Sequence, residues 1–126
     1  MPLIRIDAMK ADVNKLTAIS EAIRQALHET IGFPLNDLFH IVQSHDGDSG
    51  FLRWGDYLDV QRDEGIVYVQ VFLRAGRPAS AKQAFYAKAA ELVHREAGVE
   101  PRNLFIVLSE NQSEDWSLGN GAAQYL

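Results

Sequence analysis

The hydrophobic pattern of the chain predicts four strands and two long helices, in the order strand, helix, strand, strand, helix, strand. Runs rich in aliphatic and aromatic residues predict strands at residues 3–6, 39–43, 66–73 and 105–108. Apolar residues that recur at spacings of three and four predict helices at about 13–31 and 81–97. The residues expected to form the buried stripes of these helices are Leu16, Ile19, Ile23, Ala26, Leu27 and Ile31, and then Phe85, Ala89, Leu92 and Val93.

Capping residues fix the expected ends of both helices. Asp12 and Ser80 stand where an N-cap side chain accepts a hydrogen bond from the first turn. Gly32 and Gly98 follow the two apolar stripes, and glycine readily adopts the left-handed conformation that ends a helix. Each helix is therefore expected to stop sharply, just before the strand that follows it.

The chain contains an internal repeat. The segment "GFPLNDLF" at 32–39 corresponds to "GVEPRNLF" at 98–105, and Gly98 follows Gly32 by 66 positions. The strand and helix before each glycine also correspond, so the sequence predicts two β-α-β units, at about 2–44 and 66–110. A long loop at 45–65 joins them within one domain, 1–126. Its Asp-Gly-rich start resembles part of a calcium loop, but the closing Glu of that motif is absent and turn chemistry explains it better.

Two strands joined through a helix normally lie parallel in one sheet. Two such units predict an α+β fold, with a four-stranded mixed sheet and both helices on one face. The strand at 66–73 is apolar on both faces, because Tyr68 and Phe72 alternate with Val69 and Val71. Two helices cover only one face of the sheet, so we expect further copies of the chain to cover the other in a homo-oligomer.

Composition excludes several classes of function. The chain has 126 residues, 47% of them hydrophobic and 23% charged, which is ordinary for a globular domain. A net charge of -5 argues against nucleic acid as a partner, because phosphate contacts need clustered Lys and Arg. No cysteine is present, and no ligand spacing predicts a metal. With no signal pattern at the start and no apolar run long enough to span a membrane, we expect a cytoplasmic protein without a membrane partner.

Four ordered segments carry a resemblance to a known family. They are "PLIRID" directly after Met1, "GFPLND", "RAGR" followed by "KQAFY", and the final stretch "SEN…DWSLGNGAAQYL". Together they resemble the tautomerase superfamily, and within it the malonate semialdehyde decarboxylase branch. The resemblance implies a tautomerase/MIF-like fold, a homotrimer and catalysis without a cofactor or metal. It also implies that the group that acts is an amino-terminal proline.

The resemblance also implies the site residues: Pro2 and Asp37 as catalytic groups, and Arg74, Arg77, Trp116 and Leu118 as substrate-binding groups. Arg77 keeps its register with "KQAFY", whereas two residues, Ala75 and Gly76, separate it from Arg74 where the family has the tighter "RGR". The related cis-3-chloroacrylic acid dehalogenases use a helix histidine and a late glutamate in addition. His28 stands one residue out of register with that histidine, and the glutamate has no clear counterpart, so this branch is the weaker match.

These residue types suit chemistry on a small carboxylic acid. An amino-terminal nitrogen titrates near neutral pH, so its neighbours decide whether Pro2, once Met1 is removed, serves as acid or base. Arginine binds a carboxylate through two parallel hydrogen bonds. The first hypothesis is decarboxylation of a small 3-oxo acid such as malonate semialdehyde. The alternatives are tautomerisation or hydration of an enolic or unsaturated acid, and a non-catalytic binding protein that keeps the fold.

Overall fold

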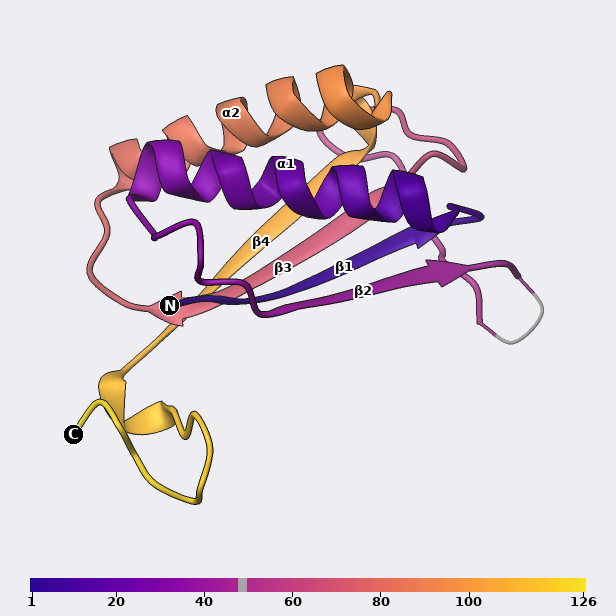
Figure 1. Ribbon diagram of the computed structural model, residues 1–126. Coiled ribbons are helices and arrows are strands. Elements are labelled where there is room, and N and C mark those ends of the chain that lie inside the picture. The colour runs from indigo at the N-terminus through magenta and orange to yellow at the C-terminus, as the bar shows by residue number, and fades with distance from the viewer. Residues whose placement is uncertain (48–49) are drawn as a thin grey trace.

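The computed structural model describes residues 1–47 and 50–126, and it consists of one four-stranded sheet with two helices packed on one face (Figure 1). The elements follow in the order β1 (Leu3–Met9), α1 (Val13–Ile31), β2 (His40–His45), β3 (Val67–Arg74), α2 (Ala79–Ala97), η1 (Pro101–Asn103), β4 (Leu104–Asn111) and η2 (Ser113–Asp115). The predicted α+β class, the number of strands and the helical layer are all confirmed. The strands extend one to three residues beyond most of their predicted ends.

The strand order in the sheet is β2-β1-β3-β4. Each β-α-β unit contributes one parallel pair, β1 with β2 and β3 with β4, and the two units meet through the antiparallel pair of β1 and β3. This arrangement is the predicted mixed sheet. It also brings the start of β1 beside the end of β3, where Leu3 pairs with Phe72.

The caps explain where the helices begin and end. The Asp12 side chain accepts a hydrogen bond from the Lys15 N–H at 2.8 Å, as predicted for an N-cap. Gly32 and Gly98 end the two helices in the left-handed conformation, with φ of 90° and 69°. The prediction for α2 is wrong at its start: the helix begins at Ala79 after Pro78, and Ser80 lies inside its first turn. Proline is well suited to this place because it has a fixed φ and no N–H to satisfy.

The core lies between the helices and the sheet face that they cover. The two helices pack on each other as well as on the sheet. All of the predicted helix stripe is buried or partly buried, and the sheet adds alternate residues of β1 and β3. The fully buried large side chains are Phe85, Ile4, Ile6, Ile19, Ile23, Leu27, Ile66, Leu73, Val67, Val69, Val71 and Val93.

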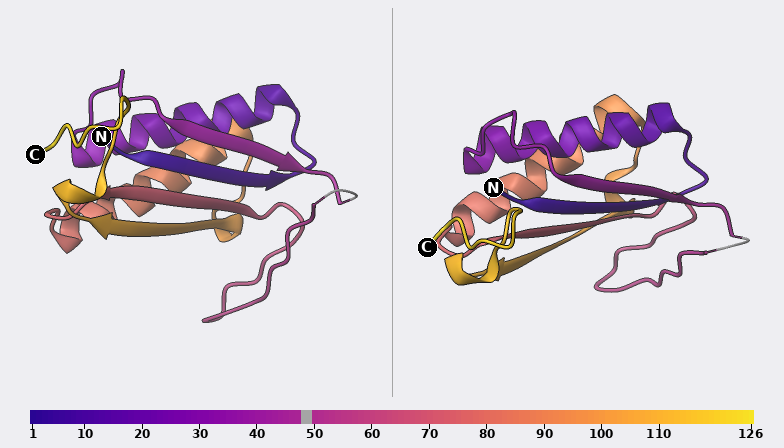
Figure 2. Two further views of the ribbon diagram at one scale, coloured as in Figure 1. Left: turned by 90° about the horizontal axis from the view of Figure 1, so that it is seen from below. Right: turned by 60° about the horizontal axis from the view of Figure 1, so that its bottom comes forward.

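Within residues 1–47 and 50–126, no helix covers the opposite face of the sheet (Figure 2). Apolar side chains on this side remain substantially exposed in the single chain: Phe39, Ile41, Phe105 and Val107. A monomer seldom presents so many large apolar groups on one sheet face, and such a patch is typical of a surface that contacts another chain.

The internal repeat extends to the side chains that finish each helix. His28 Nδ1 donates a hydrogen bond to the Phe33 carbonyl at 2.8 Å, and His94 Nδ1 donates to the Val99 carbonyl at 3.2 Å. In each unit a histidine in the last helical turn thus ties down the chain just beyond the glycine. This contact gives His28 a structural role in the single chain.

Two segments leave the compact layer at opposite ends of the sheet (Figure 2). The loop between β2 and β3 lies at one end, and Tyr68 there donates a hydrogen bond from its hydroxyl to the Arg53 carbonyl at 2.5 Å. Of the Asp-Gly-rich start of this loop, Asp48 and Ser49 lie outside the described residues. The segment after β4 lies at the other end, beside the amino terminus. No helix in the described part of the chain is long and apolar enough to cross a membrane.

Candidate functional site around the amino terminus

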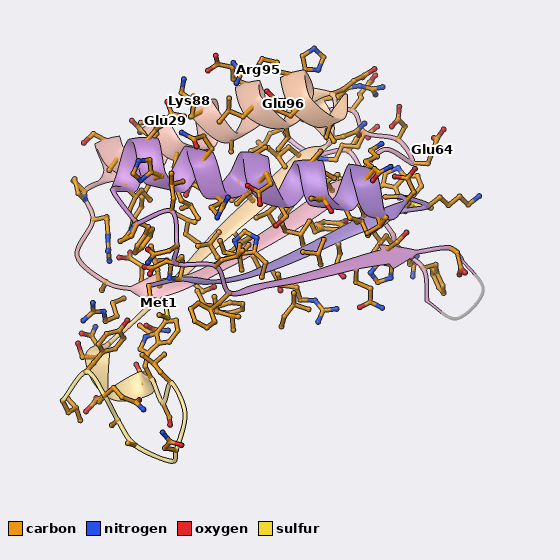
Figure 3. The ribbon with its side chains drawn as sticks, in the orientation of Figure 1. Met1, Glu29, Glu64, Lys88, Arg95 and Glu96 are labelled. Carbon is orange, nitrogen blue, oxygen red and sulfur yellow. The ribbon has the colours of Figure 1, made fainter. Side chains whose placement is uncertain are left out.

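The amino terminus lies at the end of the sheet where β1 and β2 begin (Figure 3). The Met1 amine is 3.9 Å from Asp37 Oδ2, and each of these side chains is 22% exposed. Parallel pairing produces this proximity, because Ile4 N donates to the Phe39 carbonyl and so brings the starts of the two strands together. In the structure the terminal amine belongs to Met1, while the Pro2 nitrogen is part of a peptide bond and Pro2 is buried.

The pKa of the Met1 amine is lowered from its ordinary value. Burial is the largest cause, since it disfavours the charged ammonium form. The positive charges of Arg74 and Arg77 also lower this pKa, whereas the Asp37 carboxylate raises it. Three of the residues implied by the sequence thus act electrostatically on one amine, and their combined surroundings favour its neutral form.

The two arginines are held at the turn between β3 and α2. Arg74 ends β3, and Arg77 Nη1 donates to the Arg74 carbonyl at 2.8 Å. Gly76, between the two arginines, adopts φ of 129°, a conformation that residues with a side chain rarely adopt. Its N–H donates to Glu110 Oε2 at 3.2 Å. Ala75 and Gly76 therefore form a defined turn that keeps both arginines at one end of the sheet.

Each arginine lies against an aromatic ring from another part of the chain. The guanidinium carbon of Arg77 is 4.8 Å from the ring centroid of Phe33, and that of Arg74 is 3.8 Å from the ring centroid of Tyr125. Neither arginine pairs with a carboxylate within 4.0 Å in the described part of the chain. Arg77 Nη1 is engaged by the Arg74 carbonyl and Arg74 Nη1 contacts Ser113 Oγ, so the remaining guanidinium N–H groups are the donors that an incoming anion would meet.

A cavity of about 450 Å³ opens beside the amine. It is mainly apolar, and its lining is Met1, Pro2, Leu3, Phe39, Phe72, Asn111, Asp115, Trp116, Ser117 and Leu118. Pro2, Trp116 and Leu118 thus share one cavity. Asp37, Arg74 and Arg77 do not line it, and they act on the same amine from outside its wall.

The segment after β4 supplies the far wall of this cavity. The Trp116 indole N–H donates to Asn111 Oδ1 at 2.6 Å, which fixes the ring against the end of β4. Gln112 and Asp115 form a capping box around η2, with Asp115 Oδ2 accepting from the Gln112 N–H at 2.8 Å. These contacts make the wall part of the folded structure. The sequence did not single out Phe33 and Tyr125, because they meet the arginines through long-range contacts that no local motif encodes, nor Asn111, whose contact with Trp116 depends on the fold of the segment after β4.

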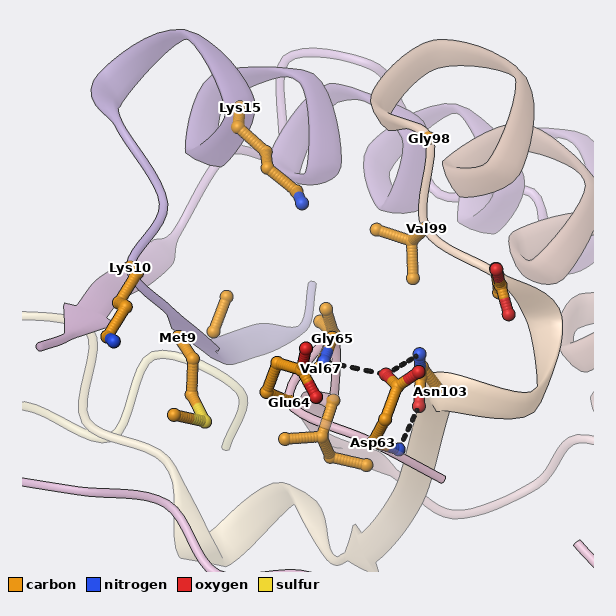
Figure 4. A pocket seen from close by; sticks show the side chains of 13 residues that line it. Met9, Lys10, Lys15, Asp63, Glu64, Gly65, Val67, Gly98, Val99 and Asn103 are labelled. Atoms are coloured by element: carbon orange, nitrogen blue, oxygen red, sulfur yellow. Dashed lines mark hydrogen bonds between the residues drawn. The ribbon is translucent and has the colours of Figure 1, made fainter. Parts of the chain in front are cut away.

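The opposite end of the sheet holds a second cavity, of about 350 Å³, whose wall includes Asn103, the residue that corresponds to Asp37 in the internal repeat (Figure 4). Asn103 stands there where Asp37 stands in the first unit, and it is almost fully buried. Asn103 donates to Asp63 Oδ1 at 2.8 Å and accepts from the Asp63 N–H at 3.1 Å. The chain runs through this end as a continuous peptide, so no terminal amine lies near it. No group of three or more potential metal ligands occurs among the described residues.

Comparison with known proteins identifies the family. The family model described as "Tautomerase enzyme" matches residues 37–119. The chain is 36% identical over 111 residues to "Probable tautomerase YusQ" of Bacillus subtilis (strain 168), which covers 88% of this chain and 87% of that protein. The chain therefore belongs to the tautomerase family, as its sequence motifs indicated.

Among solved structures, a malonate semialdehyde decarboxylase called FG41, inhibited by 3-bromopropiolate, superimposes with a TM-score of 0.86 at 35% identity. The alignment covers 98% of this chain and 93% of that one. A fused 4-OT described as a symmetric trimer superimposes with a TM-score of 0.74 at 22% identity, covering 95% and 94% of the two chains. The first similarity supports the resemblance to the decarboxylase branch, and the second shows the fold.

Proposed function

We propose that the chain is a cofactor-independent enzyme that decarboxylates a small 3-oxo acid, such as malonate semialdehyde, with the amino-terminal nitrogen of Pro2. Removal of Met1 by an aminopeptidase would free this nitrogen. The observation that carries the proposal is geometric: the terminal amine lies 3.9 Å from Asp37 Oδ2, at the end of the sheet where Arg77 is hydrogen-bonded to the Arg74 carbonyl. The full-length similarity to a malonate semialdehyde decarboxylase supports the choice of substrate class.

The surroundings lower the pKa of the Met1 amine, and the same surroundings would act on a Pro2 amine freed at this place, which supports a covalent route. A neutral Pro2 amine adds to the aldehyde carbon of the substrate, takes up a proton and loses water, which leaves an iminium ion. The electron pair of the C–C bond to the carboxylate then moves toward the iminium nitrogen as CO2 departs, and an enamine forms. The terminal carbon of the enamine takes up a proton. Hydrolysis of the second iminium ion releases acetaldehyde and restores the amine.

Arg74 and Arg77 would bind the substrate carboxylate and hold its bond to the neighbouring carbon across the plane of the iminium. The guanidinium fork suits the two oxygens of a carboxylate, and a fixed orientation lowers the barrier by pre-aligning the bond that breaks. Asp37 would orient the water that adds to and leaves the substrate. Trp116 and Leu118 would close the apolar side of the site and limit the length of the acid that fits.

Keto–enol tautomerisation is the second candidate, because the two curated relatives are described as probable tautomerases. A neutral Pro2 amine would remove a proton beside the carbonyl of an oxo acid and return it to another atom. The same arginines would hold the carboxylate. This reaction needs a base and no covalent intermediate, so the two candidates differ in what a trapping reagent detects.

We propose further that three copies of the chain assemble through the uncovered face of the sheet. Two fused 4-OT proteins of the same fold are described as trimers. The exposed apolar groups on that face, Phe39, Ile41, Phe105 and Val107, support an assembly that buries them. Sedimentation of the purified protein tests this directly, and a monomer at micromolar concentration would contradict it.

The function is tested by proton NMR and mass spectrometry on one preparation. Malonate semialdehyde and an enolised 2-oxo acid are each incubated with the protein, with and without sodium borohydride. Decarboxylation predicts acetaldehyde, and a borohydride adduct on Pro2 with the mass of an ethyl or carboxyethyl group. Tautomerisation predicts accelerated ketonisation without an adduct. If Met1 is absent and neither acid turns over, both proposed reactions are excluded for these substrates.

A further inference from the structure

The arginine at the end of β3 is held by the segment that follows β4. The guanidinium carbon of Arg74 lies 3.8 Å from the Tyr125 ring centroid. The corresponding distance from Arg77 to the Phe33 ring centroid is longer, at 4.8 Å. A guanidinium is attracted to the face of an aromatic ring, and the contact covers one side of its plane. The edges of the plane, which carry the N–H donors, stay open to a carboxylate. Arg74 makes one further weak contact, from Nη1 to Ser113 Oγ at 3.5 Å.

The Tyr125 ring reaches Arg74 because residues 117–125, which we call the hook, turn back on themselves. Gly119, Asn120 and Gly121 all have positive φ, of 134°, 57° and 67°. Three such residues in succession reverse the chain, and glycine and asparagine are the residues that adopt this conformation most readily. The hook therefore returns toward the sheet instead of extending into solvent.

One side chain closes the hook. Gln124 Oε1 accepts from the Leu118 N–H at 2.8 Å, and Gln124 Nε2 donates to the Gly119 carbonyl at 2.7 Å. The two bonds join the ends of the hook directly before Tyr125. The Tyr125 ring also meets Trp116 edge-on, with centroids 6.3 Å apart and planes inclined at 76°.

We propose that Tyr125 is a positioning residue for Arg74, and that the Gln124 side chain sets the place of its ring. The hook then has two roles in one structure: Leu118 lines the cavity beside Trp116, while Tyr125 presents the Arg74 donors to the carboxylate of the acid. The role in substrate binding rests on the proposed function, whereas the contact between ring and guanidinium does not.

The first test measures the contact without any substrate. The side-chain Nε–Hε and Cδ–H signals of Arg74, assigned with Arg74→Lys, should show the upfield displacement caused by an aromatic face. Tyr125→Phe should retain the displacement, and Tyr125→Leu and Gln124→Leu should lose it. Tyr57→Leu is the matched control, because that side chain is 73% exposed on the loop at the other end of the sheet. An unchanged Arg74 signal in Tyr125→Leu would overturn the proposal.

The second test measures binding and turnover. Tyr125→Leu should raise KM, and the dissociation constant of propanoate as an unreactive probe, about tenfold, the scale of a cation–π contact at a partly buried site. Its kcat should change much less, and Tyr125→Phe should restore both constants. Equal losses in Tyr125→Phe and Tyr125→Leu would overturn the positioning role. If propanoate does not bind the unaltered protein while the Arg74 displacement depends on Tyr125, the contact stands and the proposed substrate class fails.

Discussion

The Asp37 carboxylate lies 3.9 Å from the terminal amine of Met1, although Met1 precedes β1 and Asp37 precedes β2. Parallel pairing of β1 and β2 brings them together, and the antiparallel pairing of β1 and β3 adds the two arginines from the neighbouring strand end. One amine therefore lies under the influence of one negative and two positive side chains. The first predictions concern that balance of charge.

Asp37→Asn should lower the pKa of the amine further, because the carboxylate is the one neighbour that raises it. Activity that needs a neutral amine falls as the pH drops through this pKa, so the acidic limb of the pH–rate profile should move to lower pH in the variant. Its maximal rate should fall as well if Asp37 orients water. Asn36→Asp, which adds a charge at the adjacent position, controls for general effects of charge, and an unmoved acidic limb in Asp37→Asn would contradict the assignment.

Arg77→Gln should have the opposite effect on the amine. Arg77 lowers the amine pKa, so its loss should move the acidic limb to higher pH. It should also raise KM about tenfold to a hundredfold, the scale of a lost charge-assisted pair of hydrogen bonds. Arg95→Gln removes an exposed arginine on α2 and serves as the control. A KM equal to that of the unaltered protein would exclude Arg77 from substrate binding.

Gly65→Ala should destabilise the fold by about 1–3 kcal/mol. A Cβ at Gly65 would lie 2.7 Å from Asn103 Nδ2 and 3.1 Å from Asp63 Oδ1, and the buried Asn103 is hydrogen-bonded to Asp63. Gly55→Ala is the matched control, since its Cβ would meet open space. Urea unfolding of both variants measures the difference. Equal free energies of unfolding would show that Asp63 and Asn103 can move away from the added Cβ at no measurable cost.

Asp7→Asn should destabilise the fold at neutral pH and lose that effect in acid. Burial alone would raise the pKa of Asp7, but hydrogen bonds from Arg5 and His45 outweigh it and hold the pKa below its usual value. A carboxyl with a depressed folded pKa stabilises the fold above its unfolded pKa of about 3.9, and this stabilisation disappears as the pH falls through the folded value. The expected cost at neutral pH is about 1–3 kcal/mol.

The free energy of unfolding as a function of pH tests this prediction. Asp12→Asn is the control, because asparagine caps a helix about as well as aspartate and should change stability little. A destabilisation by Asp7→Asn that stays constant from neutral pH down to pH 3 would show that its charge contributes nothing.

The fold could be predicted from the sequence because its signals are local and repeated. The stripe from Leu16 to Ile31 and the glycines at 32 and 98 each act through neighbouring residues, and the repeat supplied every element twice. The start of α2 was the exception. Ser80 has the right side chain for an N-cap, but Pro78 occupies the N-cap position and the helix begins at Ala79, one residue before Ser80.

The site was harder to predict because its support is long-range. Short motifs were enough to predict the roles of Pro2, Asp37, Arg74 and Arg77. Substitution of each residue tests these roles. The rings under the arginines could not be nominated, since Phe33 and Tyr125 lie more than forty positions from their partners. Their place depends on the β2-β1-β3-β4 order of the sheet and on the hook, which only the folded chain reveals.

Titration of the amino-terminal nitrogen shows whether its neighbours keep Pro2 in the neutral form. In protein labelled with [15N]proline and freed of Met1, the Pro2 nitrogen is followed by NMR against pH, beside a free peptide of sequence PLIRID. We expect a pKa for Pro2 below that of the peptide, rising toward it in Arg77→Gln. A pKa at or above the peptide value, unmoved by loss of either arginine, would contradict a neutral amine facing those charges.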